Sequence, residues 1–258
     1  MNSILFITAF KDINRQNWAN SRRSNETYYK EFYNLASSIQ YNLIVFISNN
    51  NLFELKNKYN FKDNITFYDI DEYYTFFQKY VISQKKIIES EIYKSLIPPG
   101  RMNNPEHWNA EYNLINHSKI NYVSHAKKLF PTYKYYSWID FGYIKENCIG
   151  PQNIDLELLP KNKIIFQCIN DIPSNRIHPK DMLSSDTIYF SGGAFIIPNQ
   201  LIENFENCYE IKLIELENNG IVDDDQAILL QMYFDNPKLF VIMPNPKWFE
   251  FHNMLETR

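Results

Sequence analysis

Short apolar runs alternate with amphipathic stretches along the first third of the chain. Apolar, β-branched residues over 3–9, 42–48 and 64–68 predict three buried strands. Between the first two, residues 24–37 place apolar side chains near helical spacing, and Ser24 is suited to cap the helix. Because strands separated by helices form parallel sheets, this pattern predicts a parallel sheet covered by helices.

The alternation continues through the rest of the chain. We expect further strands over 133–139, 163–168, 187–190 and 239–243, and helices over 71–96, 105–129, 199–217 and 225–234. Neither an internal repeat nor a low-complexity linker interrupts this series. The pattern therefore predicts one α/β domain over residues 1–258, with a mixed, mostly parallel central sheet flanked by helices.

Composition narrows the class of protein. Of the 258 residues, 45% are hydrophobic and 22% charged, as in an ordered globular domain. A net charge of −4 without a basic block argues against a dedicated nucleic-acid binder. Cys148, Cys168 and Cys208 show no C-x-x-C spacing, and no apolar run is long enough to span a membrane. We therefore expect a soluble, cytoplasmic protein.

Glycine is scarce, with only six in the chain. No spacing among them forms a G-x-G-x-x-G or G-x-x-x-x-G-K-[ST] phosphate loop, which argues against a common dinucleotide-binding or P-loop enzyme. Because glycine is so scarce, we expect each one where the backbone conformation or a close approach requires it. Three of the six lie at candidate sites.

Two of these sites are an aspartate turn and a glycine pair. Asp140 and Gly142 follow the apolar strand over 133–139, and ligands of open α/β sheets bind at such strand ends. Gly192 and Gly193 lie between apolar runs, where they permit a ligand to approach the backbone closely. The structural alternatives are a turn that begins at Asp140 and a bulge or sharp bend at the glycine pair.

Acidic residues and a histidine complete the candidates. Asp223, Asp224 and Asp225 precede the helix over 225–234, where one carboxylate suffices for a cap. Three adjacent carboxylates repel one another, so they favour a base, a hydroxyl contact or a metal contact. His252 is either a structural residue or a ligand, and the other four histidines form no metal-binding spacing.

Taken in order, these segments resemble a glycosyltransferase of the GT-A type, and most closely the HtrL/WlaTC-like family of bacteria and viruses. The resemblance spans nearly the whole chain and rests on residues 8–15, Trp18, 108–112, Lys119, 138–143, 191–195 and 224–226. It implies a transfer of a sugar from a nucleotide-sugar donor, expected to be a UDP-sugar, to a glycan or related acceptor. Residues 1–143 would bind the donor and residues 144–258 the acceptor.

The resemblance also implies roles for individual residues. Donor contacts fall on the turn after the first strand and on a helix lysine, that is, on Thr8, Ala9, Phe10, Asp12, Arg15 and Lys119. The stretch Ser191, Gly192 and Gly193 would face the sugar and acceptor. Asp225, with Asp224 as the second choice, would deprotonate the acceptor hydroxyl of an inverting enzyme, or stabilise an oxocarbenium-like state of a retaining one.

A divalent metal, Mn²⁺ or Mg²⁺, is the implied cofactor, because a cation stabilises the departing diphosphate. The family motif is Asp-x-Asp, and Asp140 supplies its first carboxylate, with His252 as the second expected ligand. Gly142 stands where the second aspartate is expected, which departs from the motif. Two alternatives follow. The first is a non-catalytic relative that binds nucleotide or sugar. The second is a nucleotidyltransferase, which ranks last because such an enzyme normally shows an N-terminal glycine-rich signature that this chain lacks.

Overall fold

The computed structural model describes residues 3–74, 78–145, 148–185, 187–245 and 247–256. Within them a seven-stranded sheet runs in the order β3 (Ile65–Asp69), β2 (Leu43–Ile47), β1 (Ile4–Phe10), β4 (Tyr135–Ile139), β6 (Phe190–Pro198), β5 (Ile164–Cys168) and β7 (Phe240–Pro244). Strand β6 is antiparallel to both of its neighbours, and every other pairing is parallel. The mixed, mostly parallel α/β sheet expected from the sequence is confirmed.

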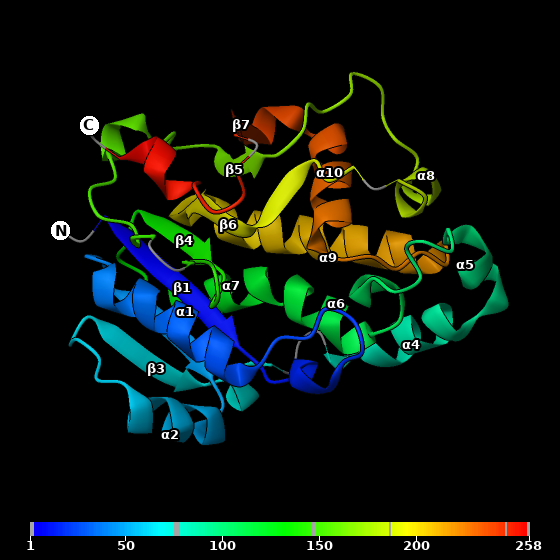
Figure 1. The fold of residues 1–258 in the computed structure, drawn as a ribbon. Coiled ribbons are helices and arrows are strands. Elements are labelled where there is room, and N and C mark those ends of the chain that lie inside the picture. The colour runs from blue at the N-terminus through cyan, green and yellow to red at the C-terminus, as the bar shows by residue number, and fades with distance from the viewer. Residues whose placement is uncertain (1–2, 75–77, 146–147, 186, 246, 257–258) are drawn as a thin grey trace.

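Helices cover both faces of the sheet (Figure 1). One face packs against α7 (Lys119–Leu129), α9 (Ile202–Asn218) and α10 (Asp225–Asp235). The other face packs against α1 (Asn25–Ser38) and α2 (Asn49–Lys58), and against a 3₁₀ turn over His252–Leu255. Each face buries its own apolar cluster, as the near-continuous apolar strands require when both faces are covered.

The capping residues explain where several helices begin. Ser24 accepts a hydrogen bond from the Thr27 amide at the start of α1, as its sequence predicts. Ser48 accepts one from the Asn51 amide, so α2 begins directly after the cap that follows β2.

The long helix predicted over 105–129 is interrupted. A 3₁₀ turn (Pro105–His107) is followed by α6 (Ala110–His117), which Asn109 caps, and then by α7. This interruption places Lys119 in the first turn of a new helix.

The helix predicted over 71–96 is also divided. Its described parts are a 3₁₀ turn (Ile70–Glu72), α4 (Val81–Glu89) and α5 (Glu91–Leu96), with Ser90 as the cap between the last two. Residues 75–77 of that prediction lie outside the described residues. The remaining elements are α8 (Pro179–Leu183) and short 3₁₀ turns over Arg15–Asn17, Leu156–Leu158, Asn199–Leu201 and Pro237–Leu239.

The strand expected over 187–190 is wrong in its position. Strand β6 begins only at Phe190 and continues through the glycine pair to Pro198. Gly192 and Gly193 therefore lie inside a strand, beside the carboxyl end of β4, and not at a bend between elements. None of the described helices is long and apolar enough to cross a membrane.

Candidate functional site

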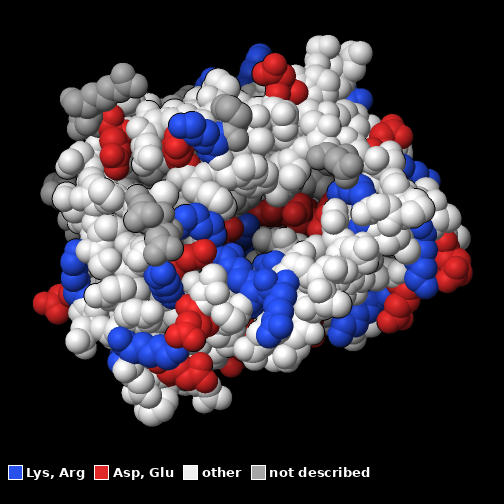
Figure 2. Space-filling model, in the orientation of Figure 1, with Lys and Arg blue, Asp and Glu red and all other residues white. Residues whose placement is uncertain are grey.

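A cleft of about 300 Å³ opens where β1 and β4 end and the antiparallel β6 begins. Carboxyl ends of parallel strands are the usual ligand-binding edge of an open α/β sheet. Figure 2 shows the cleft as a hollow near the middle of the visible face, with acidic atoms in its depth and basic side chains around its opening. The loop after β1 and the first turns of α7 and α10 complete its walls.

Three charged side chains meet at the bottom of the cleft. The Lys119 ammonium lies 2.9 Å from Asp225 Oδ2 and 3.2 Å from Asp140 Oδ1. It also donates a hydrogen bond of 2.9 Å to the Gly192 carbonyl. The side chains of Lys119 and Asp225 are only 8% and 7% exposed, whereas that of Asp140 is 40% exposed. We call Lys119, Asp140 and Asp225 the charged triad.

Burial and the neighbouring charges act in opposite directions on the two buried members of the triad, Lys119 and Asp225. Burial lowers the pKa of Lys119, but the Asp140 and Asp225 carboxylates outweigh it and raise that pKa above its ordinary value. Burial raises the pKa of Asp225, and Lys119 opposes that rise. Trp138 supports the third member by donating its indole N–H to Asp140 Oδ1 at 2.7 Å. The triad thus holds one cation between two carboxylates at the base of an open cleft.

The glycine pair is explained by close approach to this triad. A β-carbon at Gly192 would overlap the Asp225 carboxylate. At Gly193 a β-carbon would come within 3.2 Å of the Tyr143 ring. The absence of a side chain at Gly192 therefore lets β6 pass directly over the carboxylate. The Gly192 carbonyl accepts a hydrogen bond from the Lys119 ammonium.

Asp224 connects this cleft to a second cavity of about 310 Å³. Its carboxylate caps α10 by accepting a 3.0 Å hydrogen bond from the Gln226 amide. Burial, together with the neighbouring Asp225 and Asp223 carboxylates, raises its pKa well above the ordinary value. Burial likewise raises the pKa of Asp223 to about 7. The two cavities share Arg15, Tyr112, Asp224 and Gln226.

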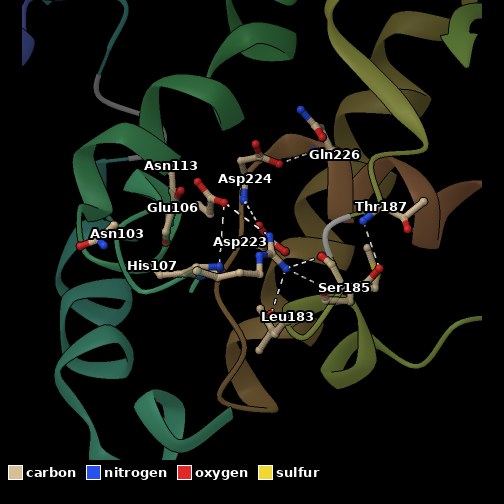
Figure 3. Close-up of polar contacts among 12 residues, drawn as sticks. Asn103, Glu106, His107, Asn113, Leu183, Ser185, Thr187, Asp223, Asp224 and Gln226 are labelled. Atoms are coloured by element: carbon tan, nitrogen blue, oxygen red, sulfur yellow. Dashed lines mark hydrogen bonds and ion pairs between the residues drawn. The ribbon is translucent and has the colours of Figure 1, made fainter. Parts of the chain in front are cut away.

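The second cavity has a polar wall around Glu106, shown in Figure 3. Arg101 Nη2 lies 3.5 Å from Glu106 Oε1, and Arg101 Nη1 donates to the carbonyls of Met182 and Leu183 at 2.9 Å each. His107 follows Glu106 in the chain, and burial lowers the pKa of this histidine to about 4. The wall thus combines a fixed guanidinium with carboxyl groups, which suits hydrogen bonding to hydroxyls.

Several basic side chains line the first cleft, and we call three of them, Arg15, Arg23 and Lys145, the basic rim. Arg23 pairs with Glu31 and stacks on the Tyr28 ring, with 3.9 Å from Cζ to the ring centroid. Lys145 lies 3.1 Å from Glu31 Oε1 and donates to the Gly142 carbonyl at 2.8 Å.

The structure brings most of the predicted site residues together. Those that line the first cleft are Ala9, Phe10, Asp12, Arg15, Lys119, Asp140, Ser191, Gly192, Gly193, Asp224 and Asp225. Asp12 is committed to its own loop, because it accepts hydrogen bonds from the Asn14 amide and the Asn25 side chain, both at 2.7 Å.

Thr8 and His252 are not among the residues that line the cleft. Thr8 is fully buried in β1, and its hydroxyl has no hydrogen-bond partner among the described residues. His252 lies on the opposite face of the sheet, where Nε2 is 3.0 Å from Ser137 Oγ and the ring contacts Phe6 and Tyr143. Burial lowers its pKa to about 3, so it is neutral. The structure does not bring His252 together with Asp140.

Arg23 and Lys145 belong to the site but were not singled out from the sequence. Two features of the sequence could have drawn attention to them. Arg22 and Arg23 form a basic pair immediately before the Ser24 cap, and Lys145 follows the Asp140 turn by only five residues. Neither signal says which way a side chain points, and both residues become significant only when the sheet places α1 beside the end of β4.

The donors around Asp140 do not fit the metal site that the resemblance implies. Asp140 already contacts Lys119 and Trp138, and His252 lies across the sheet. The place of the second carboxylate is also occupied, because a β-carbon on Gly142 would overlap the Arg23 guanidinium. Across the described ranges, no three His, Cys, Asp or Glu side chains are arranged to hold a metal ion.

Comparison with known proteins identifies relatives over almost the whole chain. The family model described as "Bacterial protein of unknown function (HtrL_YibB)" matches residues 2–257. Protein HtrL of Escherichia coli (strain K12) is 26% identical over 264 residues, which cover 96% of this chain and 90% of HtrL. A 4-diphosphocytidyl-2C-methyl-D-erythritol synthase from Anaerococcus prevotii superimposes with a TM-score of 0.43 and 11% identity, covering 98% of this chain and 96% of that one.

Proposed function

The chain belongs to the HtrL_YibB family of bacterial proteins, and we propose that it is a glycosyltransferase that uses a nucleotide-sugar donor. The observation that carries this proposal is the charged triad at the bottom of a cleft whose opening is basic. A nucleoside diphosphate is an anion that suits the basic opening, and a sugar hydroxyl is a proton donor that suits a carboxylate.

In this proposal the donor occupies the first cleft, built mainly by residues 1–143, and its diphosphate faces the basic rim. The acceptor glycan approaches through the second cavity, whose wall comes partly from residues 144–258. The shared residues Tyr112 and Asp224 then mark where the two substrates meet. A UDP-sugar is the donor to test first.

Asp225 is the proposed catalytic base. In an inverting transfer the acceptor oxygen forms a bond to the anomeric carbon while the bond to the diphosphate oxygen breaks. The hydroxyl proton passes to the Asp225 carboxylate, and the diphosphate leaves with the bonding electron pair. Lys119 contacts Asp225 and opposes the rise in its pKa that burial causes. Asp224 is less suited to this role because it caps α10 and its pKa is raised further.

The test is donor turnover in a panel of UDP-sugars, measured as UDP release with and without added glycans, together with UDP binding by calorimetry. Asp225→Asn should reduce turnover by about 10²–10⁴-fold and leave UDP affinity within about twofold. Asp63→Asn, an exposed aspartate in a distant turn, is the matched control and should change neither quantity. Product stereochemistry then separates the base from an oxocarbenium-stabilising carboxylate.

A non-catalytic binding protein is the second candidate, favoured by one observation. Lys119 pairs with both Asp140 and Asp225, and such pairing weakens a carboxylate as a base. This candidate predicts UDP or sugar binding without any turnover in the presence of acceptor. Binding without turnover across the whole panel would replace the enzymatic proposal with this one.

A further inference from the structure

The space beside Gly142 is occupied by two side chains, those of Arg23 and Glu31. A β-carbon at this position would overlap the Arg23 guanidinium and would lie 2.7 Å from Glu31 Oε2. Arg23 Nη2 and Lys145 Nζ both donate to the Gly142 carbonyl, at 3.3 and 2.8 Å. The space where the family motif would place a second carboxylate is therefore occupied by the Arg23–Glu31 ion pair, and Lys145 contacts the carbonyl of the same residue.

Asp140 is likewise engaged by protein groups. Its Oδ1 accepts from Trp138 and lies 3.2 Å from the Lys119 ammonium, which also contacts Asp225. Lys119 thus supplies the positive charge between the two carboxylates that a divalent ion would otherwise supply. A lysine carries one positive charge, so Lys119 compensates one of the two carboxylates, but its ammonium occupies the position between them.

In its ion pairs among the described residues, the basic rim has more cations than carboxylates. Glu31 is the described carboxylate in ion-pair contact with Arg23 and Lys145, so two cations share one anion there. Arg15 adds a third cation, held by hydrogen bonds from Nη1 to the Tyr28 hydroxyl and from Nη2 to the Ser21 carbonyl. Its Nε is buried and has no hydrogen-bond partner among the described residues. Such a group of fixed donors with excess charge suits an anion.

We propose that the basic rim binds the diphosphate of the nucleotide directly, and that no divalent cation is required. This inference rests on the proposed function, because it assigns the means by which the same cleft holds its donor. Arg15, Arg23 and Lys145 are then binding residues that neutralise the charge which grows on the departing diphosphate. The aromatic contacts of Arg23 with Tyr28 and of Lys145 with Phe249 fix their directions before the ligand arrives.

The experiment is calorimetry with two probes, UDP and inorganic pyrophosphate, each in EDTA and in Mn²⁺. We expect both probes to bind in EDTA, with affinities within about twofold of those in Mn²⁺. Lys145→Met should weaken both probes by about 10–100-fold, the range of one charge-assisted hydrogen bond. Uridine, which lacks phosphate, should lose no affinity. Lys238→Met, at an exposed lysine far along the chain, is the control and should change nothing.

A variant that gains affinity separates the proposal from simple misfolding, because a misfolded protein would not bind more tightly. Glu31→Gln removes the carboxylate that compensates Arg23 and Lys145, so it should strengthen pyrophosphate binding several-fold. Lys145→Arg should preserve binding. Loss of UDP binding in EDTA and its recovery in Mn²⁺ would overturn the inference and leave the glycosyltransferase proposal standing. Pyrophosphate binding without binding of any nucleotide or nucleotide-sugar would support the rim and overturn the proposed function.

Discussion

Strand β4 separates two buried polar centres that differ in charge. On the side of Trp138, the Lys119 ammonium contacts the Asp140 and Asp225 carboxylates at the bottom of a cleft. On the side of Ser137, neutral His252 bonds to a hydroxyl and is enclosed by aromatic rings. Ser137 and Trp138 are adjacent in the chain, and the alternation of a strand sends them to opposite faces.

The comparison shows what turns a buried polar group into a candidate for chemistry. Each centre holds a buried group with a shifted pKa, but the causes differ: the neighbouring carboxylates raise the pKa of Lys119, whereas burial lowers that of His252. Only the triad combines opposite charges with a cleft large enough for a ligand. His252 faces the apolar cluster that includes Phe251 and Leu255, so its place in the molecule is that of a packing residue.

The largest expected effect on stability comes from removing the cation of the charged triad. Lys119→Met leaves two neighbouring carboxylates without their cation, and loss of one member of a buried ion pair destabilises by about 3–5 kcal/mol. Urea unfolding at pH 7 measures this loss. The double variant Lys119→Met with Asp225→Asn should recover part of it. If Lys119→Met unfolds at the wild-type urea concentration, the triad is not the paired set described above.

A smaller effect is expected from crowding the same side. Gly192→Ala places a methyl group against the Asp225 carboxylate, so it should destabilise by about 1–3 kcal/mol and reduce turnover at least tenfold. Gly193→Ala meets the edge of the Tyr143 ring at 3.2 Å and Asp140 Oδ2 at 3.6 Å, and serves as the milder comparison, with a loss below about 1 kcal/mol. Thermal unfolding and UDP release compare the pair. Equal effects from both alanines would show that the carboxylate yields as easily as the ring.

The neutral side is tested through acid stability. Burial holds the pKa of His252 at about 3, below its unfolded value of about 6.5. The stability from keeping this ring neutral is complete above pH 6.5 and is lost as the pH falls toward 3, by up to about 1.4 kcal/mol per unit. His252→Phe should cost about 1 kcal/mol at pH 7 and should reduce the loss of stability on acidification.

The UDP affinity of the His252→Phe variant tests separately whether His252 takes part in the cleft. His252→Phe should leave UDP affinity in EDTA and in Mn²⁺ unchanged, because the residue lies across the sheet from the cleft. A change confined to the Mn²⁺ condition would restore His252 as the metal ligand that the sequence resemblance suggests.

The smallest expected effect is a pH dependence at the basic rim. Burial lowers the pKa of Lys145 to about 8, and the charged or titratable groups around it are Arg23, Arg15, Asp140, Cys148 and Glu31. Below pH 8 this lysine is a cation that attracts a diphosphate, and above pH 8 it loses that charge. UDP affinity should fall roughly fourfold between pH 7 and 8.5. Lys145→Arg should remove the fall, and an unchanged slope in this variant would assign it to another group.

Much of the fold could be predicted from the sequence because local signals were strong. Apolar runs located β1, β2 and β3, and Ser24 marked the start of α1. The interruption at 108–109 and at Ser118 escaped prediction because the apolar spacing continues on both sides of it. The start of β6 was misplaced because Gly192 and Gly193 are poor strand formers, and their use there follows from the proximity of Asp225.

The site was predicted less completely, and the reason is spatial. Asp140, Asp225 and the glycine pair stood out because their residue types were unusual for their positions. That Lys119 contacts all three segments could not be read from a sequence in which they lie up to about a hundred residues away. Strand alternation alone sends Ser137, and with it His252, to the far side of β4.

The contacts of Lys119 also have an evolutionary consequence. Its three bonds join a helix, two strand ends and the start of another helix, and each partner is adjusted to the same ammonium group. Replacement of Lys119 alone leaves two carboxylates without their cation, so natural change at this lysine should pass through paired substitutions. Among relatives we expect positions 119, 140 and 225 to be inherited as a unit, and Gly192 to be free to gain a side chain only where residue 225 becomes smaller.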